Sequence, residues 1–186
     1  MRMLFRILLL MVLLTGMTQA EDLNSDVQRW MIVNDTVMGG RSKADLSILG
    51  ESEEVFRFFG TLSLENNGGF ASVRAVFPRN YFTSADHVCI RVRGDGRRYQ
   101  LRLRGARSFD GVAFATSFDT EENEWLDYKF AVKDFVPTYR GRQLRGIPDI
   151  RPDEIRQVTF MIADKKPGEF QLDFSSIRPC SSDSFI

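Results

Sequence analysis

The feature that most constrains the fold is an alternation of apolar and polar side chains between Val88 and Arg104. Apolar residues occupy every second position on both sides of an interruption at Gly94-Asp95-Gly96. Such a period of two is typical of a strand with one buried face, whereas a helix repeats its apolar positions every three to four residues. Because a Gly-Asp-Gly run supplies the backbone freedom of a tight turn, the segment predicts a β-hairpin.

Shorter strand patterns, each bounded by turn residues, occupy most of the remaining chain. We expect further strands at 55–59, 71–77, 112–118, 126–132, 158–163 and 170–177. Helical signals are limited to single turns near 133–136 and 153–156, and residues 138–152 are the longest stretch without a strand pattern. Many short strands separated by turns predict an all-β, antiparallel β-sandwich or barrel. At 186 residues and 43% hydrophobic, the chain can build one domain with its own core.

The first twenty residues have the layout of a secretory signal peptide. Arg2 and Arg6 precede an unbroken apolar run at 7–14, and the small residue Ala20 ends the segment. The run is much shorter than the roughly 20 residues of a membrane-spanning helix. We therefore expect cleavage after Ala20, a single mature domain at 21–186 without a transmembrane span, and a periplasmic or secreted location.

The cysteines and the charge balance limit the possible crosslinks and the possible class of partner. Cys89 and Cys180 are the only cysteines. An exported protein could join them in a disulfide, and unpaired thiols fit the sequence equally well. With 25 basic and 25 acidic residues the formal net charge is zero, so we expect no nucleic-acid partner, since that class needs a basic surplus.

Few groups suit catalysis or metal binding. His87 is the only histidine, so a catalytic triad would depend on it, and no nucleophile motif accompanies it. The acidic turn at 119–124 could hold a calcium ion or a catalytic carboxylate pair, but it lacks the spacing of an EF-hand and is explained more simply as a solvated turn. We predict no enzyme activity, no metal and no cofactor.

Arginines occupy many of the polar positions of the alternating segment. If the segment is a hairpin, one outer face carries Arg91, Arg93, Arg98, Arg102 and Arg104. These cations either pair with carboxylates on neighbouring strands, such as Asp127 or Asp173, or form a surface that grips carboxylate, phosphate or saccharide hydroxyl groups. Trp125 either stacks on a sugar ring or packs at the sandwich edge. The candidate ligand-binding residues are Arg74, Arg91, Arg93, Arg98, Arg102, Trp125 and Arg140.

Two glycine-rich segments, 34–42 and 65–70, are each typical of a tight turn. Paired glycines permit positive φ angles and close backbone approach, and neighbouring Asn and Asp side chains bond to the turn backbone. We assign structural roles to Asn34, Asp35, Gly39, Gly40, Asn67, Gly68, Gly69, Gly94, Asp95 and Gly96.

Taken in order, these motifs are similar to those of a known family. The series is Trp30, Asn34-Asp35-Thr36-Val37-Met38-Gly39-Gly40-Arg41-Ser42, Phe59-Gly60-Thr61-Leu62, Asn66-Asn67-Gly68-Gly69-Phe70-Ala71-Ser72-Val73-Arg74, Arg93-Gly94-Asp95-Gly96-Arg97-Arg98-Tyr99 and Tyr139-Arg140-Gly141-Arg142. It resembles the family of the thirty-kilodalton complex I intermediate-associated protein over about residues 30–177. The resemblance implies a galactose-binding-like jelly roll without enzyme activity.

The resemblance also implies a class of function. Mitochondrial members of that family assist the assembly of respiratory complex I. The secretory leader departs from a mitochondrial transit pattern, so we expect an exported binding module that acts as a protein-interaction or assembly factor of the cell envelope. The alternative is a carbohydrate- or small-anion-binding module that uses the arginine-rich sheet face.

Overall fold

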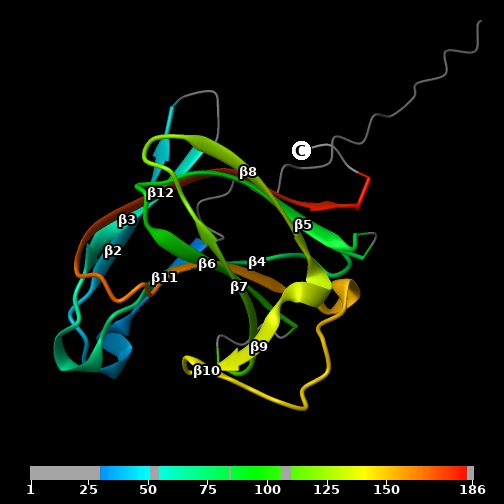
Figure 1. Cartoon of the computed structure of the whole chain (residues 1–186), viewed down its shortest axis with the longest axis horizontal. Coiled ribbons are helices and arrows are strands. Elements are labelled where there is room, and N and C mark those ends of the chain that lie inside the picture. The colour runs from blue at the N-terminus through cyan, green and yellow to red at the C-terminus, as the bar shows by residue number, and fades with distance from the viewer. Residues whose placement is uncertain (1–29, 51–54, 84, 106–109, 184–186) are drawn as a thin grey trace, which may run out of the picture.

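The computed structural model describes residues 30–50, 55–83, 85–105 and 110–183. Two antiparallel sheets pack face to face across these residues (Figure 1), which confirms the predicted all-β sandwich. The predicted signal peptide, residues 1–20, lies outside the described ranges. Among the helices in those ranges, none has the length and apolar character needed to cross a bilayer.

The strands divide unequally between two sheets. The seven-stranded sheet has the order β1 (Trp30–Asn34), β4 (Ala71–Val76), β11 (Gln157–Ile162), β6 (Arg98–Arg104), β7 (Ala113–Asp119), β9 (Val136–Tyr139) and β10 (Arg142–Gln143). The five-stranded sheet has the order β2 (Lys43–Leu49), β3 (Val55–Leu62), β12 (Gly168–Cys180), β5 (His87–Arg93) and β8 (Trp125–Ala131). Helical structure in the described residues is confined to four 3₁₀ turns, η2 (Asp35–Met38), η3 (Glu65–Asn67), η4 (Val132–Asp134) and η5 (Pro152–Glu154).

The inner faces of the two sheets meet in an aromatic core. The ring centre of Phe174 lies 4.8 Å from that of Trp30, 4.8 Å from that of Phe160 and 5.3 Å from that of Phe56. The three phenylalanines are fully buried. Because each strand turns its alternate apolar side chains toward this core, its polar side chains are left on the outer faces of the sandwich.

The predicted β-hairpin at 88–104 is wrong. The segment does form two strands, but β5 pairs with β8 and β12, whereas β6 pairs with β7 and β11. The Gly94-Asp95-Gly96 run therefore carries the chain from one sheet to the other. Alternation shows which face of a strand is buried, and turn residues show where it ends. Neither shows whether the next strand lies beside the first or opposite it.

Asp95 holds this crossing between the sheets. Its carboxylate accepts a hydrogen bond from the Tyr99 hydroxyl at 3.0 Å and one from the backbone N–H of Gln171 at 2.8 Å. Burial and the charge of Asp95 raise the pKa of Tyr99, so the phenol remains a donor. Gly94 lies so close to Thr120 that a Cβ would overlap its side chain. The crossing is thus fixed by close packing as well as by hydrogen bonds.

The long strand β12 lies in the middle of the five-stranded sheet, between β3 and β5. Cys180 at its end forms a disulfide with Cys89 of β5, which settles the alternative that the sequence left open. The two cysteines are separated by 91 residues. Closing a loop of that length stabilises the fold by about 4.6 kcal/mol in the chain-entropy model, because it restricts the unfolded chain.

The stretch at 138–152, predicted to lack strands, contains a short hairpin. Thr138 pairs with Gln143, and Tyr139 pairs with Arg142, between β9 and β10. A strand of two residues is too short to leave an alternation in the sequence, so the pattern could not show it. The remainder of the stretch is irregular up to η5.

A buried carboxylate joins the two glycine-rich segments at one end of the sandwich. Asp35 is 0% exposed and accepts hydrogen bonds from the backbone N–H and the hydroxyl of Ser42, at 2.9 and 2.6 Å. It also accepts bonds from the backbone N–H groups of Gly69 and Phe70, at 2.6 and 3.3 Å. Burial raises the pKa of Asp35, but these hydrogen bonds together lower it by more, so the net pKa is below its usual value.

Glycines surround Asp35 for two separate reasons. Gly39 and Gly69 have φ angles of 88° and 118°, a region that residues with a Cβ rarely adopt. A Cβ on Gly40 or Gly68 would instead collide with the Asp35 carboxylate. The two segments therefore fold as one unit, with η2 and η3 joined through Asp35. We call this unit the double turn, residues 34–42 and 65–70.

We expect Asp35→Ala to lower the free energy of unfolding by roughly 3 kcal/mol or more, because two buried and two half-buried donors lose a charged acceptor. Urea denaturation measures the change. Asp45→Ala is the matched control, since Asp45 is exposed and bonds only to the backbone N–H of the next residue. The control should change stability by less than about 0.5 kcal/mol. Equal losses in the two variants would contradict the role of Asp35.

The lowered pKa of Asp35 also predicts a pH dependence. The unfolded chain takes up a proton on Asp35 before the folded chain does as the pH falls. The contribution of Asp35 to the free energy of unfolding is therefore fully present above its ordinary pKa of 3.8. It is lost as the pH falls through the lower pKa that Asp35 has in the folded protein. We expect the melting temperature of the parent to fall more steeply below about pH 4 than that of Asp35→Asn. Parallel curves would refute this assignment.

Candidate functional site

The arginines of the alternating segment lie on two different faces of the sandwich. Arg91 and Arg93 belong to β5 and point outward from the five-stranded sheet, whereas Arg98 and Arg102 belong to β6 and point outward from the seven-stranded sheet. The single arginine surface expected from a hairpin is therefore wrong, because its two strands are in opposite sheets.

On the five-stranded sheet, carboxylates neutralise the arginines. Asp173, which is 0% exposed, accepts hydrogen bonds from Nε of Arg57 at 2.7 Å and from Nη2 of Arg93 at 2.8 Å. Arg91 donates to Asp127 at 2.7 Å. The hydrogen bond with Asp173 raises the pKa of Arg57. On this face the arginines make the pairs that the sequence offered as the structural alternative to ligand binding.

Trp125 also lies on the outer face of the five-stranded sheet, opposite Arg93 in the pairing of β8 with β5. The guanidinium carbons of Arg91 and Arg93 lie 5.6 and 5.0 Å from the centre of its ring. Cation–π attraction therefore adds to the ion pairs of both arginines. These contacts account for Trp125, Arg91 and Arg93 without a ligand.

A second group of arginines lies on the outer face of the seven-stranded sheet. Arg74 of β4 and Arg102 and Arg104 of β6 are only 7%, 8% and 5% exposed, and we call these three the arginine face. Thr159 of β11 is opposite both Arg74 and Arg102 in the strand register, so one row crosses three strands. Arg74 donates from Nε to the hydroxyl of Ser72 at 3.2 Å.

Arg102 and Arg104 contact neutral atoms. Arg102 donates to the hydroxyl of Thr138 at 2.8 Å and lies 3.0 Å from Sδ of Met161. Arg104 reaches the hydroxyl of Thr159 at 3.5 Å. In both arginines Nε is buried without a hydrogen-bond partner. Across the described ranges neither guanidinium forms an ion pair, so two buried cations keep unused donors.

The pKa values show that these cations destabilise one another. Burial and, to a lesser extent, the charge of Arg104 together lower the pKa of Arg74 and of Arg102 to about 10. Burial also lowers the pKa of Arg104, against the opposing effect of the Asp110 charge. An anionic oxygen group on this face would accept bonds from the guanidinium groups and relieve their repulsion.

The two other candidate arginines are exposed surface groups. Arg98 lies 3.8 Å from the carboxylate of Asp119, and both side chains are mostly solvated. Arg140 follows β9 with a φ angle of 47°, and its guanidinium lies 5.3 Å from the ring of Tyr139. Of the predicted candidates, the structure thus brings Arg74 and Arg102 together on the seven-stranded sheet and Arg91, Arg93 and Trp125 together on the five-stranded sheet. It leaves Arg98 and Arg140 as separate exposed side chains.

Sequence reasoning missed the neutral partners of the arginine face. Thr159 and Met161 occupy the polar phase of β11, so alternation does place them on an outer face. What the sequence did not show is that β11 separates β4 from β6, which brings Arg74 and Arg102 to the same threonine. Thr138 lies in the short strand β9, which has no recognisable alternation in the sequence.

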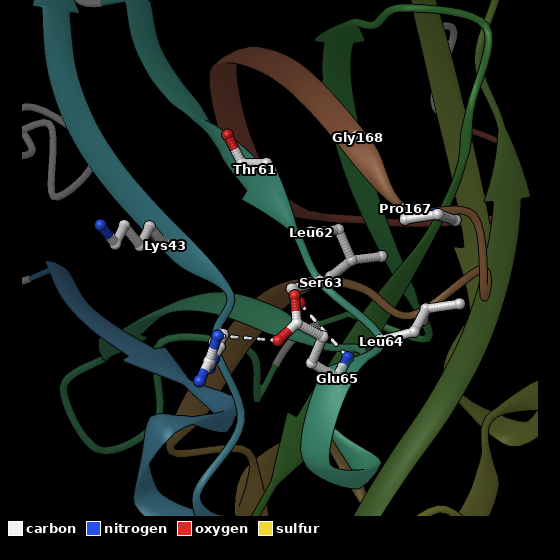
Figure 2. A pocket seen from close by; sticks show the side chains of 9 residues that line it. Lys43, Thr61, Leu62, Ser63, Leu64, Glu65, Pro167 and Gly168 are labelled. Atoms are coloured by element: carbon white, nitrogen blue, oxygen red, sulfur yellow. Dashed lines mark hydrogen bonds and ion pairs between the residues drawn. The ribbon is translucent and has the colours of Figure 1, made fainter.

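Two hollows of the surface are lined by residues outside the arginine face. One, of about 900 Å³, is lined by Arg41, Lys43, residues 61–65, Pro167 and Gly168 (Figure 2). In the view of Figure 2, Lys43 is on one side of this hollow and Leu64 and Pro167 are on the other. The second, of about 430 Å³, is lined by the Asp86–His87 pair, residues 131–133, 149–152 and Ser182. We place the candidate site at the arginine face because its buried donors lack acceptors, and neither hollow is lined by those arginines.

No group of three or more histidines, cysteines, aspartates or glutamates suited to a metal ion exists in the described ranges. The acidic turn considered for calcium, residues 119–124, falls inside them and is mostly exposed. His87 is half-buried at the start of β5 and pairs with Asp86 at 2.7 Å.

Comparison with known proteins places the chain in a family. Residues 18–174 match the family model described as complex I intermediate-associated protein 30. The chain belongs to this family. The match confirms the resemblance that the motif series indicated and covers nearly all of the described residues.

Curated relatives of the family are distant in sequence. The mitochondrial complex I intermediate-associated protein 30 of Mus musculus is 24% identical over 171 residues, which is 82% of this chain and 52% of the mouse protein. An uncharacterised protein of Schizosaccharomyces pombe is 25% identical over 171 residues, 81% of this chain and 77% of its own length. The chain thus spans about half the length of the mouse relative.

Solved structures with a similar fold include carbohydrate-binding modules. The family 11 module of a cellulosomal cellulase of Clostridium thermocellum has a TM-score of 0.63 at 16% identity, covering 88% of this chain and 95% of the module. A second structure shows the family 11 module from the same organism in complex with a beta-1,3-1,4-mixed-linked tetrasaccharide. It has a TM-score of 0.61 at 14% identity and covers 86% of this chain and 95% of the module. The likeness confirms the galactose-binding-like jelly roll.

We expect Arg102→Met to raise the free energy of unfolding by about 1 kcal/mol, because an apolar side chain of similar length removes a buried charge that has no counterion. Asp173→Asn should lower it by roughly 2 kcal/mol, since two half-buried arginines lose their common partner. Thermal and urea denaturation measure both. A loss of stability in Arg102→Met as large as that in Asp173→Asn would show that the arginine face is internally compensated.

Proposed function

We propose that this protein is an exported, non-catalytic binding module that engages an anionic group of its partner with the arginine face. The observation that carries the proposal is the pair of buried guanidinium groups, Arg102 and Arg104, whose Nε donors have no partner. A protein under no functional demand would gain stability by replacing them. Arginine forks match the two oxygens of a carboxylate, which makes them suited to bind an acidic partner.

For the class of partner, we propose a protein of the cell envelope whose assembly this module assists. The family match supports an assembly role, since the mouse relative is named for association with a complex I intermediate. The signal-like leader supports export, and the Cys89–Cys180 disulfide is consistent with an oxidising compartment. The acidic side chains of such a partner would supply the carboxylates.

A second candidate function is the binding of a saccharide, and one observation favours it. The fold is shared with family 11 carbohydrate-binding modules, one of them in complex with a tetrasaccharide. Three cations would select an acidic saccharide over a neutral one, because guanidinium groups bond more strongly to carboxylates than to hydroxyl groups.

The protein-partner proposal can be tested by site-specific crosslinking in envelope extracts. A photoreactive side chain at Gln100 lies on the outer face of β6 beside Arg102, and one at Ser47 lies on the outer face of β2 as the matched control. We expect a recurring protein adduct from position 100 alone, weakened by high salt and by the double change Arg102→Met with Arg104→Met. Adducts that persist in the double variant would overturn the arginine face as the contact.

Calorimetry tests the second candidate with two probes, an oligogalacturonate and the neutral mixed-linked tetrasaccharide. If the saccharide function holds, the acidic probe should bind and should lose affinity by roughly tenfold or more in the double variant. Arg91→Met is the control, because Arg91 is on the opposite sheet. Absence of heat with both probes, together with an adduct at position 100, would remove the saccharide function and leave the protein partner.

A further inference from the structure

The double turn presents apolar side chains to solvent at one end of the sandwich. Val37 is 71% exposed, Met38 is 61% exposed and Leu64, next to η3, is 43% exposed. Three of the eight exposed large hydrophobic residues of the described ranges therefore lie at this one place. In Figure 1, η2 and η3 are the blue and blue-green coils side by side at the lower left.

The exposure of Val37 and Met38 is held by the fold. Both residues belong to the single turn η2, whose first residue is the buried Asp35. Asn66 of η3 donates a hydrogen bond to the carbonyl of Gly39 at 3.2 Å, so the two turns are also tied at their tips. With both ends of η2 anchored, neither side chain can reach the core. The tip is a fixed apolar projection.

Basic side chains lie near this projection, in the double turn and around the adjoining hollow. The segments 36–43, 61–68 and 165–169, parts of which line the hollow of Figure 2, contain four basic residues and two acidic residues. The basic residues are Arg41, Lys43, Lys165 and Lys166, all exposed. The acidic residues are Glu65 and Glu169, and Glu169 is opposite Thr61 in the strand register. Glu65 pairs with Arg41 at 2.9 Å, and both of these side chains are more than 60% exposed. A surplus of positive charge thus flanks the apolar tip.

We propose that the double turn docks on an anionic lipid surface. Apolar side chains flanked by cations suit a bilayer boundary, where the apolar groups pass below the headgroups and the cations meet lipid phosphates. A small projecting tip is a poor match for a stable protein interface, which buries about 1,200 Å² or more. The geometry would bring the module to a membrane through one end of the sandwich, independently of the function proposed for the arginine face.

A fluorophore at the tip tests this docking and separates it from membrane binding by any other segment. Val37→Cys labelled with an environment-sensitive nitrobenzoxadiazole probe should shift its emission to the blue and brighten when vesicles of phosphatidylglycerol and phosphatidylcholine are added. The native cysteines are buried in their disulfide and remain unlabelled. The same probe on Ile147→Cys, an exposed apolar position remote from the double turn in sequence, should not respond.

Three comparisons decide the outcome. Vesicles of phosphatidylcholine alone should give a much smaller response, and added salt should reduce the response on anionic vesicles. In the chain labelled at position 37, Met38→Asp should weaken partition by roughly tenfold, since one of the inserted apolar side chains is replaced by a charge. Lys43→Gln with Lys165→Gln should weaken it on anionic vesicles only.

Other results would overturn the proposal. An unchanged spectrum at position 37 on anionic vesicles would do so, even if the protein sediments with them, because another segment would then carry the binding. Equal responses at positions 37 and 147, or on neutral and anionic vesicles, would also do so. A response at position 37 to envelope protein but not to protein-free vesicles would assign the tip to a protein partner instead.

Discussion

The packing of two sheets through one aromatic core is the constraint on which the rest of the structure depends. Trp30, Phe56, Phe160 and Phe174 occupy the space between the sheets, and every long strand gives its alternate apolar side chains to that space. The charged residues of the same strands are thereby forced outward. Because the chain crosses between sheets at residues 94–97, consecutive arginines are delivered to opposite outer faces.

The arginines have different partners on the two outer faces of the sandwich. On the five-stranded sheet, Asp173 lies between Arg57 and Arg93, and the cations stabilise the fold through a shared counterion. On the seven-stranded sheet, Arg102 and Arg104 contact a thioether and hydroxyl groups and keep unused donors. The same residue type is neutralised on one side, and on the other it keeps the donors that we propose for binding.

The sequence could predict the fold class because alternation and turn residues are local properties. It also named Asp127 and Asp173 as partners of strand arginines, since acidic residues in the polar phase of strands must lie on an outer face. It could not predict which strands are neighbours, and this explains both the wrong hairpin and the missed row through Thr159. Likewise, the glycine-rich segments indicated turns. The joining role of Asp35 could not be predicted, because it depends on hydrogen bonds to Gly69 and Phe70, which are 34 and 35 positions further along the chain.

The central position of β12 has a consequence for the order of events in folding. Its neighbours β3 and β5 come much earlier in the chain, so the five-stranded sheet stays divided into β2–β3 and β5–β8 until the last strand is synthesised. Phe174, whose ring lies against those of Trp30, Phe56 and Phe160, also waits for that strand. Such non-local pairing makes the closure of the sheet slower than the formation of its local hairpins. A nascent chain of this design therefore cannot complete its five-stranded sheet until β12 has left the ribosome.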